Sequence, residues 1–446
     1  MLRTTLLVAA LAATFPAVAD PDLNALRAEI QALKSNYEAR IQALETRLQQ
    51  TENAAPVALP AAEAAPVQSA GNRFNPDISL ILQGGYTHLG NGDKRRITGF
   101  MPADHDSTPT RGFSLNGTEL VMSASIDPSF RGHLIVALQD EAAEVEEAWF
   151  QTTRLGNGFS IKGGRFRSGL GYQNEKHPHA WDFADNTLMY RALFGEAYGN
   201  DGLQLKWVAP TDLFLELGAE AGRGANFPGT DRNRNGVGSV ALFGHLGGDV
   251  GASHSWRGGL SYLQTQARDR EASLDDLNAV EGNTLFSGKS KTWVADFVWK
   301  WAPEGNASER SFKFSTEYFL RNERGTLLCQ DNTSDFGKCD GTEGAYRTQQ
   351  SGLYAQGVYQ FMPRWRTGYR YDRLNTGSVD FGSNNASLNA GNYSPIRHSL
   401  MLDYSPSEFS RLRLQYSKDK SMQGLAENQW FVQYVHSLGS HGAHTF

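Results

Sequence analysis

The sequence predicts an all-β fold: a 16-stranded antiparallel transmembrane β-barrel preceded by a short N-terminal coiled-coil helix. Three observations lead to this prediction. After Phe74, polar and apolar residues alternate with a period of two, which is typical of strands that face water on one side only. The alternating segments number sixteen, an even count, and each has about ten residues. The connections between them alternate between long and short, as at the two rims of a membrane-spanning barrel.

Two segments show the alternation most clearly. In 213–221 the odd positions are Leu or Ala, whereas Glu216 and Glu220 occupy even positions. In 293–301 the odd positions are Trp, Ala or Phe, and Asp296 and Lys300 occupy even ones. Each segment therefore has one apolar and one polar face. The sixteen predicted strands are 78–89, 114–126, 130–140, 145–153, 159–166, 202–209, 213–223, 236–246, 254–267, 291–302, 312–324, 347–361, 365–374, 396–405, 410–418 and 429–438.

The connections support a barrel over a sandwich. Tight turns such as Asp127-Pro128-Ser129 and Met362-Pro363-Arg364 alternate with connections that are mostly long. A soluble sandwich has no reason to sort its loops in this way, whereas an outer-membrane barrel has short turns on one side and longer loops on the other. The predicted longer connections are 90–113, 139–144, 167–201, 224–235, 268–290, 325–346, 375–395 and 419–428.

The residues before the barrel divide into three predicted parts. Residues 1–19 are expected to be a secretory signal peptide, because an apolar run follows Arg3 and small residues precede Asp20. In residues 20–50, apolar positions follow a heptad pattern with one four-residue stutter, which predicts a periplasmic coiled-coil helix that associates as a trimer. A helix lying on the protein's own surface is the alternative. Residues 51–73 are rich in Ala and Pro and predict a semi-extended linker to the barrel of 74–446.

Composition excludes several classes of protein. The chain has 446 residues, 40% hydrophobic and 20% charged, and its mean hydropathy is −0.46. No stretch after the first twenty residues approaches the roughly 18 to 20 apolar residues that a spanning helix needs, which excludes a helical membrane protein. A net charge of −6 indicates no excess of basic residues of the kind that nucleic-acid-binding proteins need, so nucleic acid is not an expected partner. In an exported protein, Cys329 and Cys339 predict a disulfide, with two free thiols as the alternative.

Parts of the chain resemble known families. The strand pattern, the long third loop and the terminal Phe446 resemble Gram-negative porins, and the coiled-coil segment is similar to that of the phosphate-selective porin group. Residues 74–84 (FNPDISLILQG) and 174–183 (NEKHPHAWDF) resemble a proteobacterial family labelled zinc-regulated TonB-dependent outer-membrane receptor. These resemblances imply a protein of the Gram-negative cell outer membrane, in contact with outer-membrane lipid, that forms a homotrimer and passes small hydrophilic solutes.

The third long connection, 167–201, is the predicted constriction of the channel. Sixteen strands enclose a lumen too wide for wall side chains to fill, so a loop must narrow it. This loop is the longest one and follows the fifth predicted strand. An ordinary extracellular loop is the alternative. The predicted constriction residues are Glu175, Lys176, His177, His179, Trp181, Asp182 and Asp185.

The inward phase of the tenth to fifteenth predicted strands is rich in basic residues. An acidic loop opposite a basic wall would set up a transverse field that orients dipolar solutes. The alternative is that these charges simply form the solvated interior of the barrel. The predicted pore-wall residues are Lys300, Lys313, Glu317, Arg321, Arg366, Arg370, Asp372, Arg411 and Arg413.

The sequence gives little support to a metal site or to an enzyme active site. His177 and His179 with Glu175 form the one metal-like cluster, but two His without a third ligand of fixed geometry do not define a site, so neither a metal nor another cofactor is expected. The chain contains no G-x-S-x-G and no evident Ser/His/Asp set, so no enzyme is expected. The sequence thus predicts an outer-membrane porin for passive diffusion of small hydrophilic solutes or ions. The alternative is a zinc uptake receptor or a substrate-specific channel.

Overall fold

The fold is described from a computed structural model of the chain. The structure describes residues 76–90, 96–101, 110–115, 117–138, 142–333 and 337–439. The predicted signal peptide, coiled-coil helix and linker, and the terminal Phe446, lie outside these residues. The chain divides after Asn72 into two units, and every described residue belongs to the second, Arg73–Phe446.

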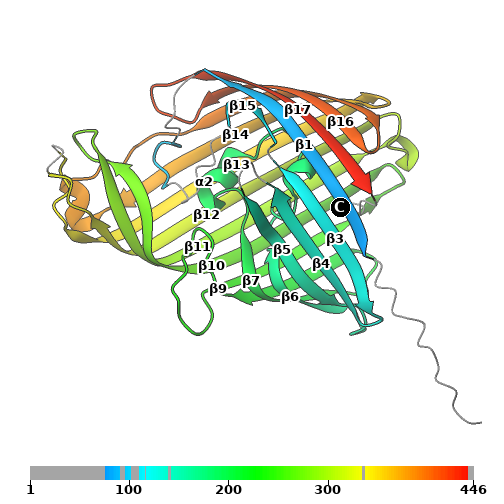
Figure 1. Cartoon of the computed structure of the whole chain (residues 1–446), viewed down its shortest axis with the longest axis horizontal. Coiled ribbons are helices and arrows are strands. Elements are labelled where there is room, and N and C mark those ends of the chain that lie inside the picture. Colours follow the sequence, from blue (N-terminus) through cyan, green and yellow to red (C-terminus); the bar gives the residue numbers. More distant parts are fainter. Residues whose placement is uncertain are drawn as a thin grey trace, which may run out of the picture. The chain divides into compact units, whose positions relative to one another are not determined.

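The described strands form one antiparallel sheet that closes on itself (Figure 1). β2 (Gly112–Ser114) and β3 (Thr118–Asp127) both pair with β1 (Asp77–Leu89), so they form one interrupted strand and the barrel has sixteen. The prediction of a 16-stranded antiparallel barrel is therefore confirmed. The other strands are β4 (Phe130–Leu138), β5 (Ala143–Thr152), β6 (Phe159–Arg167), β7 (Gly199–Val208), β8 (Phe214–Gly222), β9 (Ser239–Val250), β10 (His254–Asp275), β11 (Glu281–Trp301), β12 (Ser311–Cys329), β13 (Glu343–Met362), β14 (Trp365–Asp380), β15 (Ile396–Ser407), β16 (Ser410–Lys420) and β17 (Glu427–Gly439).

Each strand pairs antiparallel with its neighbour in sequence, across the tight turns of one rim and the longer connections of the other. The ring closes where β1 pairs with β17, from Ser79 opposite Gly439 to Leu89 opposite Gln429. Closure gives each described strand a neighbour on both sides, so the described sheet has no free outer edge, as a β-structure in lipid requires.

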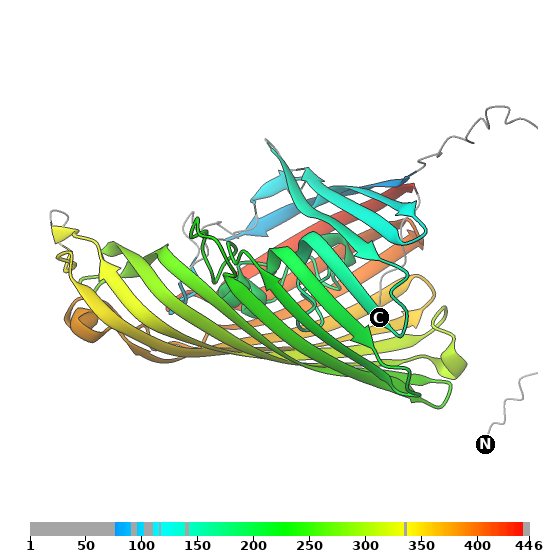
Figure 2. The same cartoon turned by 90° about the horizontal axis from the view of Figure 1, so that it is seen from below.

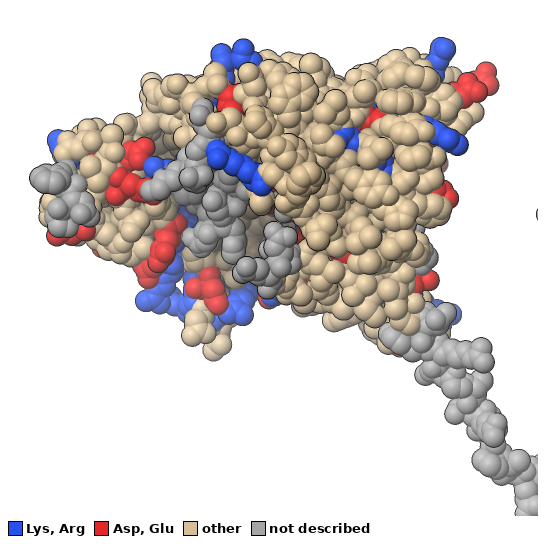
Figure 3. All heavy atoms as spheres, turned by 45° about the horizontal axis from the view of Figure 1, so that its top comes forward, with Lys and Arg blue, Asp and Glu red and all other residues tan. Residues whose placement is uncertain are grey.

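Alternation sorts the side chains between the two faces of the barrel wall. On β11, Trp293 and Phe297 are 47% and 40% exposed, whereas Val294 is fully buried between them in sequence. On β7, Leu203 and Leu205 are exposed on either side of the buried Gln204. On the face shown in Figure 3 most of the surface is uncharged, and charged side chains gather toward its edges. The barrel thus presents an apolar outer surface and keeps its polar residues inside.

The core of the barrel lies within the ring of strands. In the described part of the chain the helical segments are η1 (Pro178–Ala180), α2 (Leu188–Phe194), η2 (Pro303–Gly305) and η4 (Gly382–Ala386). Buried residues of α2, among them Met189 and Leu193, pack in one cluster with inward-facing Val294 and Phe319 of the wall. Among the described residues, no helix is long and apolar enough to cross a membrane.

The strands β10 to β14 are longer than the sequence predicted. Residues 268–290 were expected to form a long connection, but β10 continues to Asp275 and β11 begins at Glu281. The inward side chains of these extensions, including Phe286, Leu327 and Tyr346, form a second buried cluster that holds the strands together beyond the predicted ends. The alternation there uses small and polar residues, which resemble a loop in the sequence.

The predicted disulfide between Cys329 and Cys339 is confirmed. Cys329 is the last residue of β12, and the two Cα atoms are 5.3 Å apart. Both cysteines are fully buried in the second cluster, so the disulfide joins the end of β12 to the connection that follows it.

Candidate functional site: the lumen loop

The connection between β6 and β7 folds into the barrel (Figure 2). We call residues 168–198 the lumen loop; it contains η1 and α2. The Thr187 side chain caps α2 by accepting a hydrogen bond from the Tyr190 amide at 3.3 Å. Gly195 ends the helix with a φ of 69°, a left-handed conformation that suits glycine. These signals set a seven-residue helix inside the barrel.

Hydrogen bonds close the base of the lumen loop. The Asn174 amide donates to the carbonyl oxygens of Ser168 (2.7 Å) and Tyr198 (2.8 Å), and its Oδ1 accepts from the Tyr198 amide at 2.7 Å. Glu220 on β8 accepts from the Ser168 hydroxyl at 2.6 Å and the Gly169 amide at 2.9 Å. The two ends of the loop are thus joined to each other and to the wall.

Glu317 on β12 is a buried centre of hydrogen bonds. Its carboxylate accepts from the backbone amides of Tyr172 (3.2 Å) and Gln173 (2.9 Å). It also accepts from the hydroxyls of Tyr190 and Tyr354, each at 2.9 Å. A carboxylate that is 1% exposed requires such donors, because burial without them is costly. Glu317 therefore attaches both the first turn of the loop and α2 to the wall.

Asp182 binds basic residues of the wall. Its carboxylate lies 2.5 Å from the Lys313 ammonium and 3.7 Å from the Arg366 guanidinium, and it accepts from the Gln356 amide at 3.1 Å. Burial raises the pKa of Asp182, but the charges of Lys313 and Arg366 outweigh it and hold the pKa below its usual range. Asp182 is therefore an ionised partner of the wall.

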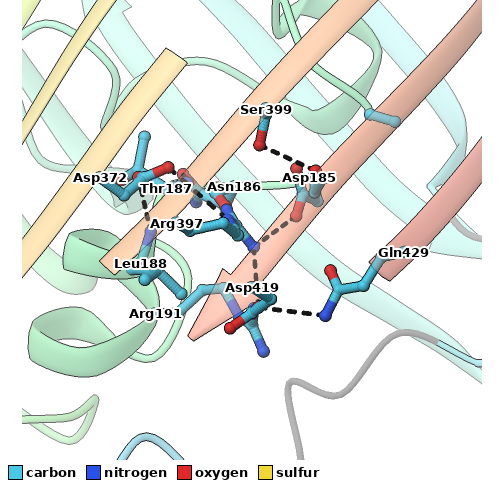
Figure 4. Close-up of polar contacts among 12 residues, drawn as sticks. Asp185, Asn186, Thr187, Leu188, Arg191, Asp372, Arg397, Ser399, Asp419 and Gln429 are labelled. Atoms are coloured by element: carbon cyan, nitrogen blue, oxygen red, sulfur yellow. Dashed lines mark hydrogen bonds and ion pairs between the residues drawn. The ribbon is translucent and has the colours of Figure 1, made fainter. Parts of the chain in front are cut away.

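Asp185 makes the second ion-paired attachment (Figure 4). Its carboxylate contacts Arg397 at 2.6 Å and Arg370 at 2.8 Å, and accepts from Gln415 at 2.8 Å. Burial again opposes ionisation, but the charges of Arg397 and Arg370 lower the pKa of Asp185. Both arginines are 1% exposed or less, so neither has water as an alternative partner.

Wall side chains also bind the two ends of α2. Asp372 on β14 accepts from the Leu188 amide at 3.0 Å, where a carboxylate complements the positive end of the helix. Arg321 on β12 donates to the Leu193 carbonyl at 3.3 Å, near the negative end. Arg370 donates to Asp372 at 3.0 Å, so the helix contact is continuous with the ion pairs of the preceding segment.

The segment around η1 is bound through its carbonyl groups. Arg411 donates to the His179 carbonyl at 2.5 Å, and Arg413 donates to the Trp181 carbonyl at 2.9 Å. The Trp181 indole donates to the Lys176 carbonyl at 2.9 Å, which folds this part of the loop back on itself.

The structure brings the predicted loop and wall residues into direct contact. The sequence had suggested an acidic loop facing a basic wall across open lumen, but Asp182 and Asp185 instead form buried ion pairs with that wall. Lys300 lies opposite Lys313 in the strand register. The predicted wall residues that contact the lumen loop are Lys313, Glu317, Arg321, Arg366, Arg370, Asp372, Arg411 and Arg413.

His177 and His179 meet three glutamates of the wall. His177 Nδ1 lies 2.9 Å from Glu146 and 3.4 Å from Glu119, and its Nε2 lies 2.8 Å from Glu147. His179 Nδ1 lies 3.2 Å from the second oxygen of Glu119. Burial lowers the pKa of His177, but the three carboxylates outweigh it and raise that pKa to about 10. The cluster is thus strongly attractive to positive charge.

The sequence did not single out these glutamates. It placed Glu175 beside the histidines, but Glu175 is exposed and no described ion pair joins it to either ring. The register of β4 and β5 shifts between Ile135 and Val136, and at this bulge the consecutive Glu146 and Glu147 both reach His177. Strict period-two parity would place consecutive residues on opposite faces, so the alternation alone does not reveal this set.

A ring of partly exposed cations lines the inner wall near the short-turn rim. Its members occupy the inward phase of eight strands, within a few residues of the tight turns. Lys313 and Arg366 have side chains 22% and 27% exposed, although both contact Asp182. We call the following set the basic ring: Arg131, Lys162, Lys206, Arg257, Lys300, Lys313, Arg366 and Arg411.

Comparison with known proteins identifies a relative in sequence. A protein of Aquifex aeolicus (strain VF5), described as uncharacterized, is 31% identical over 405 residues, covering 84% of this chain and 80% of that protein. This chain belongs to the family of the Aquifex aeolicus protein. A scan against protein-family models finds no match.

Solved structures with a similar fold are outer-membrane proteins. OmpT of Vibrio cholerae in a trimer form has a TM-score of 0.49 at 12% identity, covering 82% of this chain and 99% of that one. OprB of Pseudomonas putida has a TM-score of 0.48 at 13% identity, covering 81% and 94%. The channel DcaP of Acinetobacter baumannii has a TM-score of 0.47 at 12% identity, covering 82% and 97%.

The fold itself sets the location of this family member. A closed antiparallel barrel with an apolar outer surface, tight turns on one rim and longer connections on the other is an outer-membrane fold. The protein is an integral β-barrel of the outer membrane. Its sixteen strands are fewer than the about 22 of TonB-dependent transporters.

Proposed function

We propose that the protein is a porin that allows passive diffusion of small hydrophilic solutes through a lumen narrowed by the lumen loop. One observation carries this proposal. The loop lies inside a sixteen-stranded barrel. Its backbone binds Glu317 of β12, and its Asp182 and Asp185 pair with basic residues of β12, β14 and β15. Lumens of sixteen or more strands are water-filled in porins, so such a loop sets the width of the passage.

We further propose that the channel favours anions. The basic ring lies on the inner wall toward the short-turn rim, so an ion that crosses the lumen passes it. A ring of cations in a low-dielectric wall raises the local concentration of anions. Within the ring, Asp182 partly neutralises Lys313 and Arg366, and Asp403 lies 2.5 Å from Arg366. Glu216 partly neutralises Lys206 at 2.8 Å. The preference is therefore expected to be moderate.

Planar-bilayer recording of the purified protein tests both proposals. Stable conductance steps are expected, with a reversal potential in a KCl gradient that has the sign of anion preference. Replacing two ring residues, Lys162→Gln with Lys300→Gln, should shift that potential toward cation preference. The matched control is Lys418→Gln, an exposed lysine on the outward phase of β16. Folded barrel without conductance would contradict the porin proposal and favour a receptor or a substrate-specific channel.

We also propose a homotrimer, which is supported by the heptad pattern of residues 23–48. Deleting residues 20–50 should weaken the assembly and leave the barrel folded, since the strands close on themselves without the helix. Light scattering in mild detergent checks this. A full-length protein that is monomeric in detergent would contradict the proposal.

A further inference from the structure

The cluster formed by His177, His179, Glu119, Glu146 and Glu147 is not explained by the porin proposal. It lies between η1 of the lumen loop and the wall strands β3 and β5, on the side away from the Asp182 and Asp185 attachments. Glu119 has no exposed side-chain surface and both histidines are less than 9% exposed, whereas the Glu146 side chain is 24% exposed. The two imidazole rings are stacked, with centroids 6.0 Å apart and an interplanar angle of 20°.

Glu147 fixes the orientation of His177. One oxygen of Glu147 lies 2.8 Å from His177 Nε2, and its other oxygen accepts from the Trp149 indole at 2.7 Å. Nε2 therefore carries the ring proton of a neutral His177, and the lone pair of Nδ1 points away from Glu147. Histidines that ligate metals have this arrangement, in which a carboxylate binds the nitrogen opposite the metal.

The other nitrogen of His177 faces two carboxylates without a hydrogen bond. Nδ1 approaches Glu146 Oε2 to 2.9 Å and Glu119 Oε1 to 3.4 Å, yet neither contact has hydrogen-bond geometry. Both oxygens of Glu119 are buried, and their contacts with His177 and His179 lack hydrogen-bond geometry. Three ligand atoms that converge in this way, within 4.8 Å of one another, can bind one cation.

The spacing fits the first shell of a transition metal. Nitrogen and oxygen ligands lie about 2.0 to 2.2 Å from Zn²⁺, which places neighbouring donors of a tetrahedron roughly 3.3 Å apart. The separations of His177 Nδ1 from Glu119 (3.4 Å) and from Glu146 (2.9 Å) bracket that edge. Ca²⁺ prefers six to eight oxygen ligands, which this set of imidazoles and carboxylates does not offer.

The charges in contact also match a divalent ion. Three carboxylates contribute three negative charges, and Arg167, which donates to Glu146 at 2.7 Å, contributes one positive charge. With neutral imidazoles the groups in contact sum to two negative charges, which one divalent cation balances. Two protons on the histidines would balance them equally, and the experiment below separates these cases.

We propose that this cluster is a binding site for a divalent transition metal of the Zn²⁺ class. The ligands are His177 Nδ1, Glu119 and Glu146. Glu147 positions His177, and His179 contacts the second oxygen of Glu119. Because His177 and His179 belong to the lumen loop while the glutamates belong to the wall, the metal holds this side of the loop to β3 and β5. The site does not depend on the porin proposal, because metal binding is measurable whether or not the barrel conducts.

Zinc binding by the purified full-length barrel tests the proposal. His441→Gln with His444→Gln forms the background, which removes two further histidines from the chain. We expect one Zn²⁺ per chain by titration calorimetry, and at least tenfold weaker binding in Glu119→Gln and in His177→Gln. Co²⁺ in place of Zn²⁺ should give the visible absorption of a four-coordinate nitrogen and oxygen site, which the same variants lose.

Controls keep the outcome interpretable. His245→Gln and Glu216→Gln change a buried histidine and its carboxylate partner, 3.1 Å apart, elsewhere on the inner wall, and should leave zinc affinity unchanged. Heat-modifiable migration on a gel confirms that each variant is a folded barrel. Absence of stoichiometric Zn²⁺ binding by the folded barrel would overturn the proposal and assign the cluster to protonated histidines. Equal loss of affinity in the control variants would also overturn it.

Discussion

Replacing Asp185 with Asn should loosen the lumen loop without unfolding the barrel. The change removes the charge that contacts Arg397 at 2.6 Å and Arg370 at 2.8 Å, while it keeps the size of the side chain. Breaking a buried ion pair by removing one partner costs about 3 to 5 kcal/mol. The two arginines remain buried in the variant and keep Asp372 as a shared partner, at 3.0 and 3.6 Å.

That remaining partner places the expected cost at the lower end, about 3 kcal/mol. At about 1.4 kcal/mol per factor of ten, the population of loop released from the wall should rise roughly a hundredfold. Limited proteolysis of the folded barrel measures this release, because a protease cleaves the loop only when it leaves the wall. Single-channel recording provides a second measure, since a mobile loop adds current noise.

Asp201→Asn is the matched control. Asp201 pairs with Arg165 at 2.7 Å, but both side chains are more than 40% exposed, so the change should cost less than about 1 kcal/mol. The reasoning is refuted if Asp185→Asn, folded as a barrel, resists protease and conducts like the parent protein. It is also refuted if Asp201→Asn releases the loop equally.

Three further predictions follow from the described contacts. Glu317→Gln places an amide group among four hydrogen-bond donors. The free energy that holds the lumen loop to the wall should fall by about 2 kcal/mol, and proteolytic cleavage within residues 168–198 should increase. Unchanged cleavage would mean that Glu317 does not hold the loop. Replacing both Cys329 and Cys339 with Ser should destabilise the folded conformation of the connection after β12 by about 2 to 3 kcal/mol. New proteolytic cuts are expected within that connection. Cuts elsewhere in the barrel would contradict a local role of the disulfide. The pKa values of Asp182 and Asp185 are lowered in the folded protein, so their stabilisation is present above the ordinary Asp pKa of about 3.9 and is lost only as pH falls further. Protease resistance of the loop should therefore persist from pH 7 to about pH 4, and release of the loop near pH 6 would contradict this assignment.

The barrel was predictable because its determinants are local. Period-two alternation needs only neighbouring residues, and it gave both the sixteen strands and the inward phase of residues such as Arg370 and Asp372. The same alternation places Arg397 on the inward phase of 396–405, and this position was the sequence signal for its contact with Asp185.

The partners inside the lumen were not predictable in the same way. Asp182 and Gln356 are far apart in sequence, and their contact depends on how the lumen loop crosses the barrel. The glutamate set around His177 depends on a bulge between β4 and β5, which strict alternation hides. The extended ends of β10 to β14 depend on the buried cluster around Phe286 and the disulfide, and such packing exists only after the strands are paired.

The attachments of the lumen loop also bear on the mechanics of the barrel. A closed sheet of sixteen strands resists stretching along its hydrogen bonds, but it can flatten under lateral pressure from the bilayer. The loop is hydrogen-bonded to Glu220 of β8, Glu317 of β12 and Arg397 of β15. It therefore connects separate parts of the wall across the lumen. The attached loop therefore keeps the cross-section of the barrel constant. A change that frees the loop also lets the cross-section of the lumen vary.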